Sequence, residues 1–118
     1  MEKPQLASFD TDGWQLADAV FRHEQYPESF EIPDESVRTS LGAGDLVKLI
    51  FEYQLTGVQD DSATAERMWV EVTDRVDPFY IGSLANEPYV AQAQHKLVLG
   101  SRVVFLPDNI VNVDLAAS

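Results

Sequence analysis

Short segments in which apolar side chains recur at every second residue constrain the fold of this 118-residue chain more than any other feature. Such alternation is typical of β-strands that bury one face and expose the other. In the clearest segment, Met68, Val70 and Val72 alternate with Trp69, Glu71 and Thr73. We predict strands at residues 46–55, 67–74, 79–85 and 101–106, and the tail could add one short strand at 110–114.

Two of these strands follow the same sequence pattern. Leu41-x-x-Gly44-Asp45-x-Val47 resembles Leu97-x-x-Gly100-Ser101-x-Val103, a leucine and a glycine turn before each alternating segment. Two copies are too few to indicate a solenoid. We therefore predict that both strands begin at the same kind of tight turn, as in small barrels whose strands bend sharply at their start.

The first third of the chain has a different periodicity, which favours helices. The apolar residues that fall on one helical stripe are Trp14, Leu16, Ala17, Val20 and Phe21. Asp12 precedes the stripe as a candidate N-cap, with Gln15 completing a capping box, and Pro27 follows it. We predict a flexible lead-in over residues 1–11, a helix over 13–25 and a second, short helix over 34–41.

These elements predict an α+β fold that is mainly β, in a single domain over residues 12–118. We expect a small bent antiparallel sheet, or a half-open SH3-like barrel, with the N-terminal helix packed on it. The polar segment 57–65 is expected to be an exposed loop, and residues 88–96 fit either a loop or a short helix.

The charge of the chain limits its partners. Twenty acidic and eight basic residues give a net charge of −12, and nine acids but only two bases lie within the first 35 residues. Such a field repels nucleic acid and anionic membranes, so we expect neither as a partner. It would steer the chain toward a basic protein partner, although the simpler explanation, that the charge keeps the protein soluble, is favoured.

The composition also excludes some chemistry. The chain has no cysteine, which rules out disulfides, thiol nucleophiles and cysteine-ligated metals. No apolar run approaches the ~20 residues of a membrane span, and residues 1–12 lack the hydrophobic core of a signal peptide. A cytoplasmic location is the expectation.

The alternation places Trp69, Glu71 and Thr73 on the outer face of their strand, away from the core. An exposed tryptophan beside a carboxylate is a candidate binding anchor, because tryptophan is enriched in interface hot spots. The favoured interpretation, however, is that the N-terminal helix, with Trp14 and Phe21, covers this face, as helices commonly do on small sheets.

Two further candidates are Tyr80 and Asn86. Tyr80 could line a pocket together with Glu71. Asn86 begins the Asn86-Glu87-Pro88 corner, where a left-handed backbone or a hydrogen bond within its own turn is favoured over a role in ligand binding.

Groups for catalysis or metal binding give only weak signals. His23 and His95 have no partner at a ligand-like spacing, so a surface role is favoured for each. Glu52 and Glu71 could face each other across neighbouring strands, although exposed carboxylates balanced by Lys48, Arg67 or Arg102 are favoured. Asp60-Asp61 lacks the spacing of a calcium loop. We expect no catalytic residue, cofactor or metal.

Several motifs together resemble a known family. The motifs are Arg67-Met68-Trp69-Val70, Gly82-x-Leu84-Ala85-Asn86-Glu87-Pro88, and Leu97, Gly100 and Val103 followed by Ile110. Over residues 66–113 they resemble the small bacterial domains catalogued as domain of unknown function twenty-three-fourteen, or a close relative. The chain departs from that pattern at Gly100-Ser101, where Gly-Asp is usual, and in lacking a tryptophan near the last strand.

The resemblance implies a bacterial cytosolic protein with a mainly β fold and no established activity, and domains of this general kind also occur among immunity proteins. We therefore expect a non-catalytic protein-binding module, in its sharper form an immunity protein against a toxin. The alternatives are a small enzyme or ligand-binding domain that uses Trp69, Glu71 and Asn86, and a fold element that pairs with its own copy. The sequence leaves the oligomeric state open.

Overall fold

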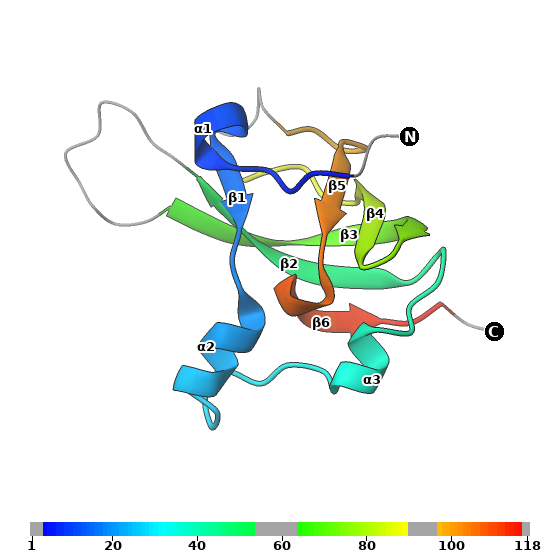
Figure 1. Ribbon diagram of the computed structural model, residues 1–118. Coiled ribbons are helices and arrows are strands. Elements are labelled where there is room, and N and C mark those ends of the chain that lie inside the picture. Colours follow the sequence, from blue (N-terminus) through cyan, green and yellow to red (C-terminus); the bar gives the residue numbers. More distant parts are fainter. Residues whose placement is uncertain (1–3, 54–63, 90–96, 117–118) are drawn as a thin grey trace.

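Six antiparallel strands form one curled sheet, a half-barrel with short helices near its N-terminus (Figure 1). The computed structural model describes residues 4–53, 64–89 and 97–116. The strands are β1 (Trp14–Leu16), β2 (Leu46–Tyr53), β3 (Thr64–Val76), β4 (Phe79–Leu84), β5 (Arg102–Phe105) and β6 (Ile110–Asp114). The helices are α1 (Phe9–Asp12), α2 (Ala19–Gln25), α3 (Glu35–Arg38) and the 3-10 turn η2 (Pro107–Asn109). The predicted fold class is confirmed.

The order of the strands explains the curl of the sheet. Hydrogen-bonded neighbours follow the order β1-β2-β3-β4-β5, and β6 pairs with β2 on the same side as β1. β1 pairs with residues 51–53 of β2, and β6 pairs with residues 46–49. The chain therefore returns from β5, at one end of the sheet, through η2 to the opposite end, and this connection holds the sheet bent.

The concave face of the half-barrel contains the main hydrophobic core. Met68, Val70 and Val72 point into it, as their alternation predicts. The other buried members of this cluster are Trp14, Leu41, Val47, Leu49, Phe51, Tyr53, Tyr80, Leu84, Leu97, Val103, Phe105 and Ile110. Every strand contributes to one interior, so the sheet and its core form as one unit.

A smaller apolar cluster lies on the outer face of β2 and β6. Ile50 and Val111 come from the sheet, Ala17 lies between β1 and α2, and Ala19 is the first residue of α2. Phe30 and Ile32, which follow α2 in the chain, pack against the cluster. In Figure 1, α2 and α3 both lie on the β6 side of the sheet. The segment from residue 17 to residue 32 therefore covers part of the outer face, as far as Ile50.

The predicted helix over 13–25 is wrong in its first half. Ser8, not Asp12, is the N-cap of a single helical turn, which ends at Gly13 with a φ of 77°. Trp14 then starts β1 opposite Tyr53, and the helix α2 begins only after Asp18, whose carboxylate accepts the N–H of Phe21. The predicted flexible lead-in over 1–11 likewise contains this capped turn, and Pro4 is buried.

Other predicted bounds change by smaller amounts. α3 covers only residues 35–38 of the predicted helix 34–41, and β3 extends over 64–76 instead of 67–74. Residues 64–65, predicted as the end of a loop, belong to β3. Residues 54–63 and 90–96, which include most of that loop and the ambiguous segment, lie outside the described residues. The additional strand at 110–114 is present as β6.

The two similar turns adopt the same structure. The N–H of Asp45 bonds the carbonyl of Gly42 at 3.1 Å, and the N–H of Ser101 bonds the carbonyl of Val98 at 2.9 Å. Gly44 and Gly100 have φ values of 96° and 92°, as a type II turn requires of its third residue. Each glycine N–H donates to the neighbouring strand, to Val72 in β3 and to Leu84 in β4 respectively. The shared turn predicted from sequence is confirmed.

Candidate functional site

Trp69 lies on the outer face of β3, half-buried, as the alternation predicts. It pairs with Lys48 on β2, whose Nζ is 4.8 Å from the centroid of the Trp69 ring. Glu71, on the same face and exposed, lies between Leu46 on β2 and Ser83 on β4. Neither Trp14 nor Phe21 covers this face, because Trp14 is in the main core and Phe21 is exposed.

Asn86 fixes the end of the β3–β4 pairing. Its Oδ1 accepts the N–H of Trp69 at 2.6 Å, and the N–H of Ala85 donates to the carbonyl of Trp69 at 2.9 Å. The side-chain amide thus continues the ladder by one step beyond Leu84. The predicted left-handed conformation is wrong, since no described residue other than glycine has a positive φ, and the bond goes to another strand instead of its own turn.

Thr73 and Tyr80 do not join Trp69 in one site. Thr73 sits at a bulge, where the pairing with β4 shifts between Val72 and Asp74, and its hydroxyl donates to the carbonyl of Ile81 at 3.1 Å. Tyr80 is fully buried on the concave face and stacks on Phe105 with centroids 5.3 Å apart. A pocket shared by Glu71 and Tyr80 is therefore ruled out, because the two side chains lie on opposite faces of the sheet.

The hydroxyl of Tyr80 has a structural role. It donates to the carbonyl of Arg38 at 2.9 Å and accepts the N–H of Leu41 at 3.3 Å. Arg75 donates a third bond to it at 3.0 Å. Tyr80 thereby ties the segment after α3 to the interior of the half-barrel.

The weaker candidates also prove to be structural where they are described. Glu52 does not face Glu71, because its cross-strand partner in β3 is Ala65. Its carboxylate forms an ion pair with Arg22 at 3.1 Å, and not with Lys48, Arg67 or Arg102. Nδ1 of His23 is 2.6 Å from the carbonyl oxygen of Phe30 and so ties α2 to the segment that follows it. Among the described residues there is no group of three potential metal ligands. His95, Asp60 and Asp61 lie outside the described residues.

A groove of about 560 Å³ lies beside Trp69 on the outer face. Its floor contains Lys48 from β2, Arg67 from β3 and residues 111–113 of β6. Residues 31–34 and Val37 form its wall, and Leu115 also lines it. The groove combines apolar side chains with two cations and two carboxylates, Glu31 and Asp34.

A second surface is formed by α2 and the turn after it. Phe21 is 55% exposed and Tyr26 is 61% exposed, although large aromatic side chains are usually buried. Exposed carboxylates surround the two rings in sequence, namely Asp18, Glu24 and Glu28. We call Phe21, Tyr26 and these three carboxylates the α2 surface.

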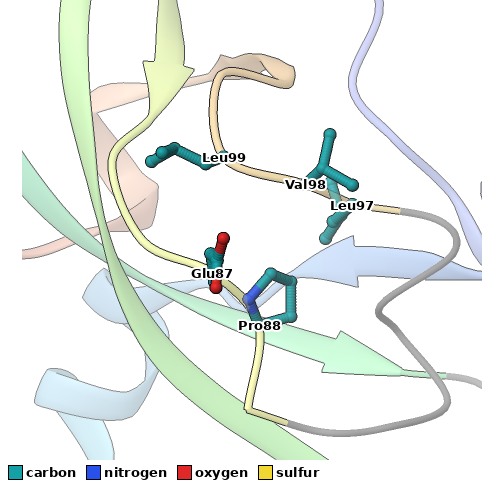
Figure 2. A pocket seen from close by; sticks show the side chains of 5 residues that line it. All are labelled: Glu87, Pro88, Leu97, Val98 and Leu99. Atoms are coloured by element: carbon teal, nitrogen blue, oxygen red, sulfur yellow. The ribbon is translucent and has the colours of Figure 1, made fainter.

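A smaller cavity of about 270 Å³ separates two loop segments (Figure 2). Glu87 and Pro88 line one side and Leu97–Leu99 line the other. Leu97 is buried in the main core, whereas Val98 and Leu99 are exposed. This cavity lies where the chain leaves and rejoins the described residues, and of the described residues that line it, Glu87 alone is charged.

Sequence reasoning missed both surfaces, each for a different reason. The helical stripe in the sequence predicts that Phe21 is buried on a long helix, so its exposure follows only once α2 is known to begin after Asp18. Lys48 and Arg67 lie in different strands, and only the register of β2 with β3 brings them together. One sequence signal for the groove is the alternation within the strands. Lys48 and Trp69 each lie between two buried residues, so both side chains are expected on the outer face.

The helices in the described part of the chain are all too short and too polar to cross a membrane. Comparison of the chain with protein-family models, with curated proteins and with solved structures finds no match in any of the three. The resemblance of residues 66–113 to the domain of unknown function therefore stays a prediction.

Proposed function

We propose that this protein is a non-catalytic binding module that captures a basic protein partner through the α2 surface. One observation carries the proposal: Phe21 in α2 and Tyr26 at its C-cap are both exposed, in a segment rich in exposed carboxylates, and the helix itself is firmly attached to the sheet. Aromatic anchors surrounded by complementary charge are typical of interface hot spots.

The attachment of α2 supports this assignment. Ala19 is fully buried against the sheet, and Arg22 reaches Glu52 on β2 at 3.1 Å. His23 bonds the carbonyl of Phe30. These contacts hold one side of the helix and leave the other side to solvent, so a partner would meet aromatic side chains whose backbone is already ordered.

The charge of the α2 surface favours a basic partner. Arg22, the one lysine or arginine on the helix, is paired with Glu52, so it does not offset Asp18, Glu24 and Glu28. The net charge of −12 acts in the same direction and would speed the encounter with a cationic protein. In its sharper form, the proposal is an immunity protein in the cytoplasm of a bacterium that covers the active site of a basic toxin.

The proposal is tested with a double variant, Phe21→Ser with Tyr26→Ser. The wild-type protein is immobilised and exposed to a native lysate, and the retained protein is identified, purified and titrated. We expect a basic partner that the double variant binds at least tenfold more weakly, with an unchanged melting temperature, because both side chains are already exposed. Val98→Ser, at a site that is 57% exposed elsewhere on the molecule, is the matched control and should bind normally.

Equal binding by the double variant, or an acidic partner, would refute the use of the α2 surface. The immunity form has its own test. It requires a neighbouring gene that encodes a toxin whose activity is inhibited by the purified protein, and it fails if the gene stands alone and no such toxin is retained.

A further inference from the structure

Two cations, Lys48 and Arg67, lie on the floor of the groove beside Trp69. Neither has a carboxylate as its cross-strand partner. Lys48 has Trp69 on one side and Asn112 on the other, and Arg67 lies opposite Ile50. Within the described part of the chain, the three ion pairs are Arg22–Glu52, Arg38–Asp108 and Arg75–Asp77. In a chain with 20 acidic residues and eight basic ones, this placement of cations is unexpected.

The register makes Lys48 and Arg67 close neighbours. Lys48 pairs with Trp69, and Ile50 pairs with Arg67, so the two cations occupy diagonal positions on one face, about 7–8 Å apart between their Cα atoms. Both side chains are also held by aromatic rings. Nζ of Lys48 is 4.8 Å from the Trp69 centroid, and Cζ of Arg67 is 5.6 Å from the Phe30 centroid. Both side chains also line the groove, and an anion bound between two like charges would be stabilised by each of them.

We propose that this groove binds a peptide segment through a single carboxylate, held by Lys48 and Arg67, with an apolar side chain against Ile32 and Val111. Arg67 can bind a carboxylate with two parallel hydrogen bonds, and Lys48 adds a point charge. The groove volume of about 560 Å³ is enough for a segment of a few residues. This site shares no residue with the α2 surface and does not depend on the proposed function.

The wall of the groove limits the charge of the ligand. Glu31 and Asp34 line the same space as the two cations and are not paired with either. Their carboxylates repel a ligand of high negative charge, so the groove should prefer a monocarboxylate over phosphate. The apolar side chains of Ile32, Val37 and Val111 favour the same choice, because they gain contacts only with an apolar ligand.

The test is a titration of the full chain, labelled with ¹⁵N, with two peptides that differ in one group. N-acetyl-Leu-Leu has a free carboxylate, and N-acetyl-Leu-Leu-amide has none. We expect the carboxylate peptide to bind at least tenfold more tightly and to shift the indole N–H of Trp69 and the amides of Lys48 and Asn112. Inorganic phosphate should bind more weakly than the carboxylate peptide.

Variants identify the groups that hold the carboxylate. Lys48→Met and Arg67→Met should each remove most of the preference for the carboxylate peptide while the amide peptide binds as before. Arg102→Met is the control, because Arg102 is an exposed cation on the outer face of β5 that does not line the groove. The proposal is overturned if both peptides bind equally, if Arg102→Met has the same effect, if the shifts map elsewhere, or if millimolar peptide produces no shift.

Discussion

Tyr53 is one of two buried tyrosines, and its hydroxyl is hydrogen-bonded inside the half-barrel. Tyr53 is only 7% exposed, and its hydroxyl donates to Oε1 of Glu66 at 2.5 Å. The other oxygen of Glu66 accepts the backbone N–H of Tyr89 at 3.0 Å. Burial, then the hydrogen bond to Glu66 and its negative charge, raise the pKa of Tyr53 far above its ordinary value of 10.0.

This shift predicts a loss of stability at alkaline pH. Because the pKa of Tyr53 is higher in the folded than in the unfolded protein, its stabilising contribution is complete below pH 10 and is lost as the pH rises above that value. Each pH unit above 10 should lower the free energy of unfolding by about 1.4 kcal/mol through this group. Urea unfolding between pH 8 and about 11 measures the effect.

Tyr53→Phe separates this group from all others that titrate in the same range. The variant should lose about 1 kcal/mol at pH 8, where the hydrogen bond to Glu66 is intact in the wild type. Above pH 10 its stability should fall less steeply than that of the wild type. If the free energy of unfolding falls with pH equally steeply in both proteins, Tyr53 does not ionise on unfolding as described.

At this scale the sequence predicts side-chain direction well and side-chain role poorly. The alternation gives the correct face for Met68, Val70 and Trp69, because the period of a strand is fixed by backbone geometry. It does not reveal that Tyr80 bonds the carbonyl of Arg38, or that Asn86 bonds the N–H of Trp69. Those partners are 42 and 17 residues away, and only the folded sheet brings them together.

Elements with a sustained period are predicted from sequence, and a three-residue strand is not. β2 and β3 are long enough for alternation to be distinguished from a helical stripe. Trp14–Leu16 is too short for any period, and its apolar residues fit a helix equally well. It forms a strand because Trp14 packs on Phe51, with centroids 5.5 Å apart, and pairs with Tyr53. Tertiary packing, not local propensity, decides this element.

The paired turns give a prediction at the scale of elements. Gly44 and Gly100 have φ values near +90°, and an added Cβ would meet only Ala116 at 3.6 Å in the first case and nothing within 4 Å in the second. The cost of Gly44→Ala or Gly100→Ala is therefore backbone strain alone, about 1–2 kcal/mol for each. Urea unfolding of the purified variants measures it.

Gly42→Ala is the matched control for both variants. Gly42 lies in the first of the two turns but has no positive φ, and an added Cβ would have no neighbour within 4 Å. Its substitution should be neutral or slightly stabilising, because alanine lowers the entropy of the unfolded chain. A loss at Gly42 equal to that at Gly44 would show that the turn does not depend on the left-handed residue.

At the scale of the whole molecule, the sequence indicates a bent sheet but not its closure. The position of β6 beside β2 joins residues 46–49 to 110–114, and no local pattern contains that information. The buried Asn109 marks the connection, because its amide donates to the carbonyl of Ala17 at 3.1 Å, across 92 residues of sequence. Strand order and curl follow from such long-range contacts.

The net charge of −12 predicts a dependence of stability on salt that belongs to the molecule as a whole. At about 0.01 M salt the Debye length, about 30 Å, exceeds the radius of gyration of 14.2 Å, so carboxylates on all sides of the fold repel one another. At about 0.15 M it falls to about 8 Å, and only near neighbours interact. We expect the free energy of unfolding to rise by roughly 1 kcal/mol over this range of sodium chloride, because folding brings the charges closer together.

The double variant Glu24→Gln with Glu28→Gln tests this repulsion. Both carboxylates are exposed on or next to α2, and neither forms one of the three described ion pairs. The variant should therefore be more stable than the wild type at low salt, and its stability should change less with added salt. A stability that falls with salt would instead mean that attractive pairs such as Arg22–Glu52 outweigh the repulsion among the unpaired carboxylates.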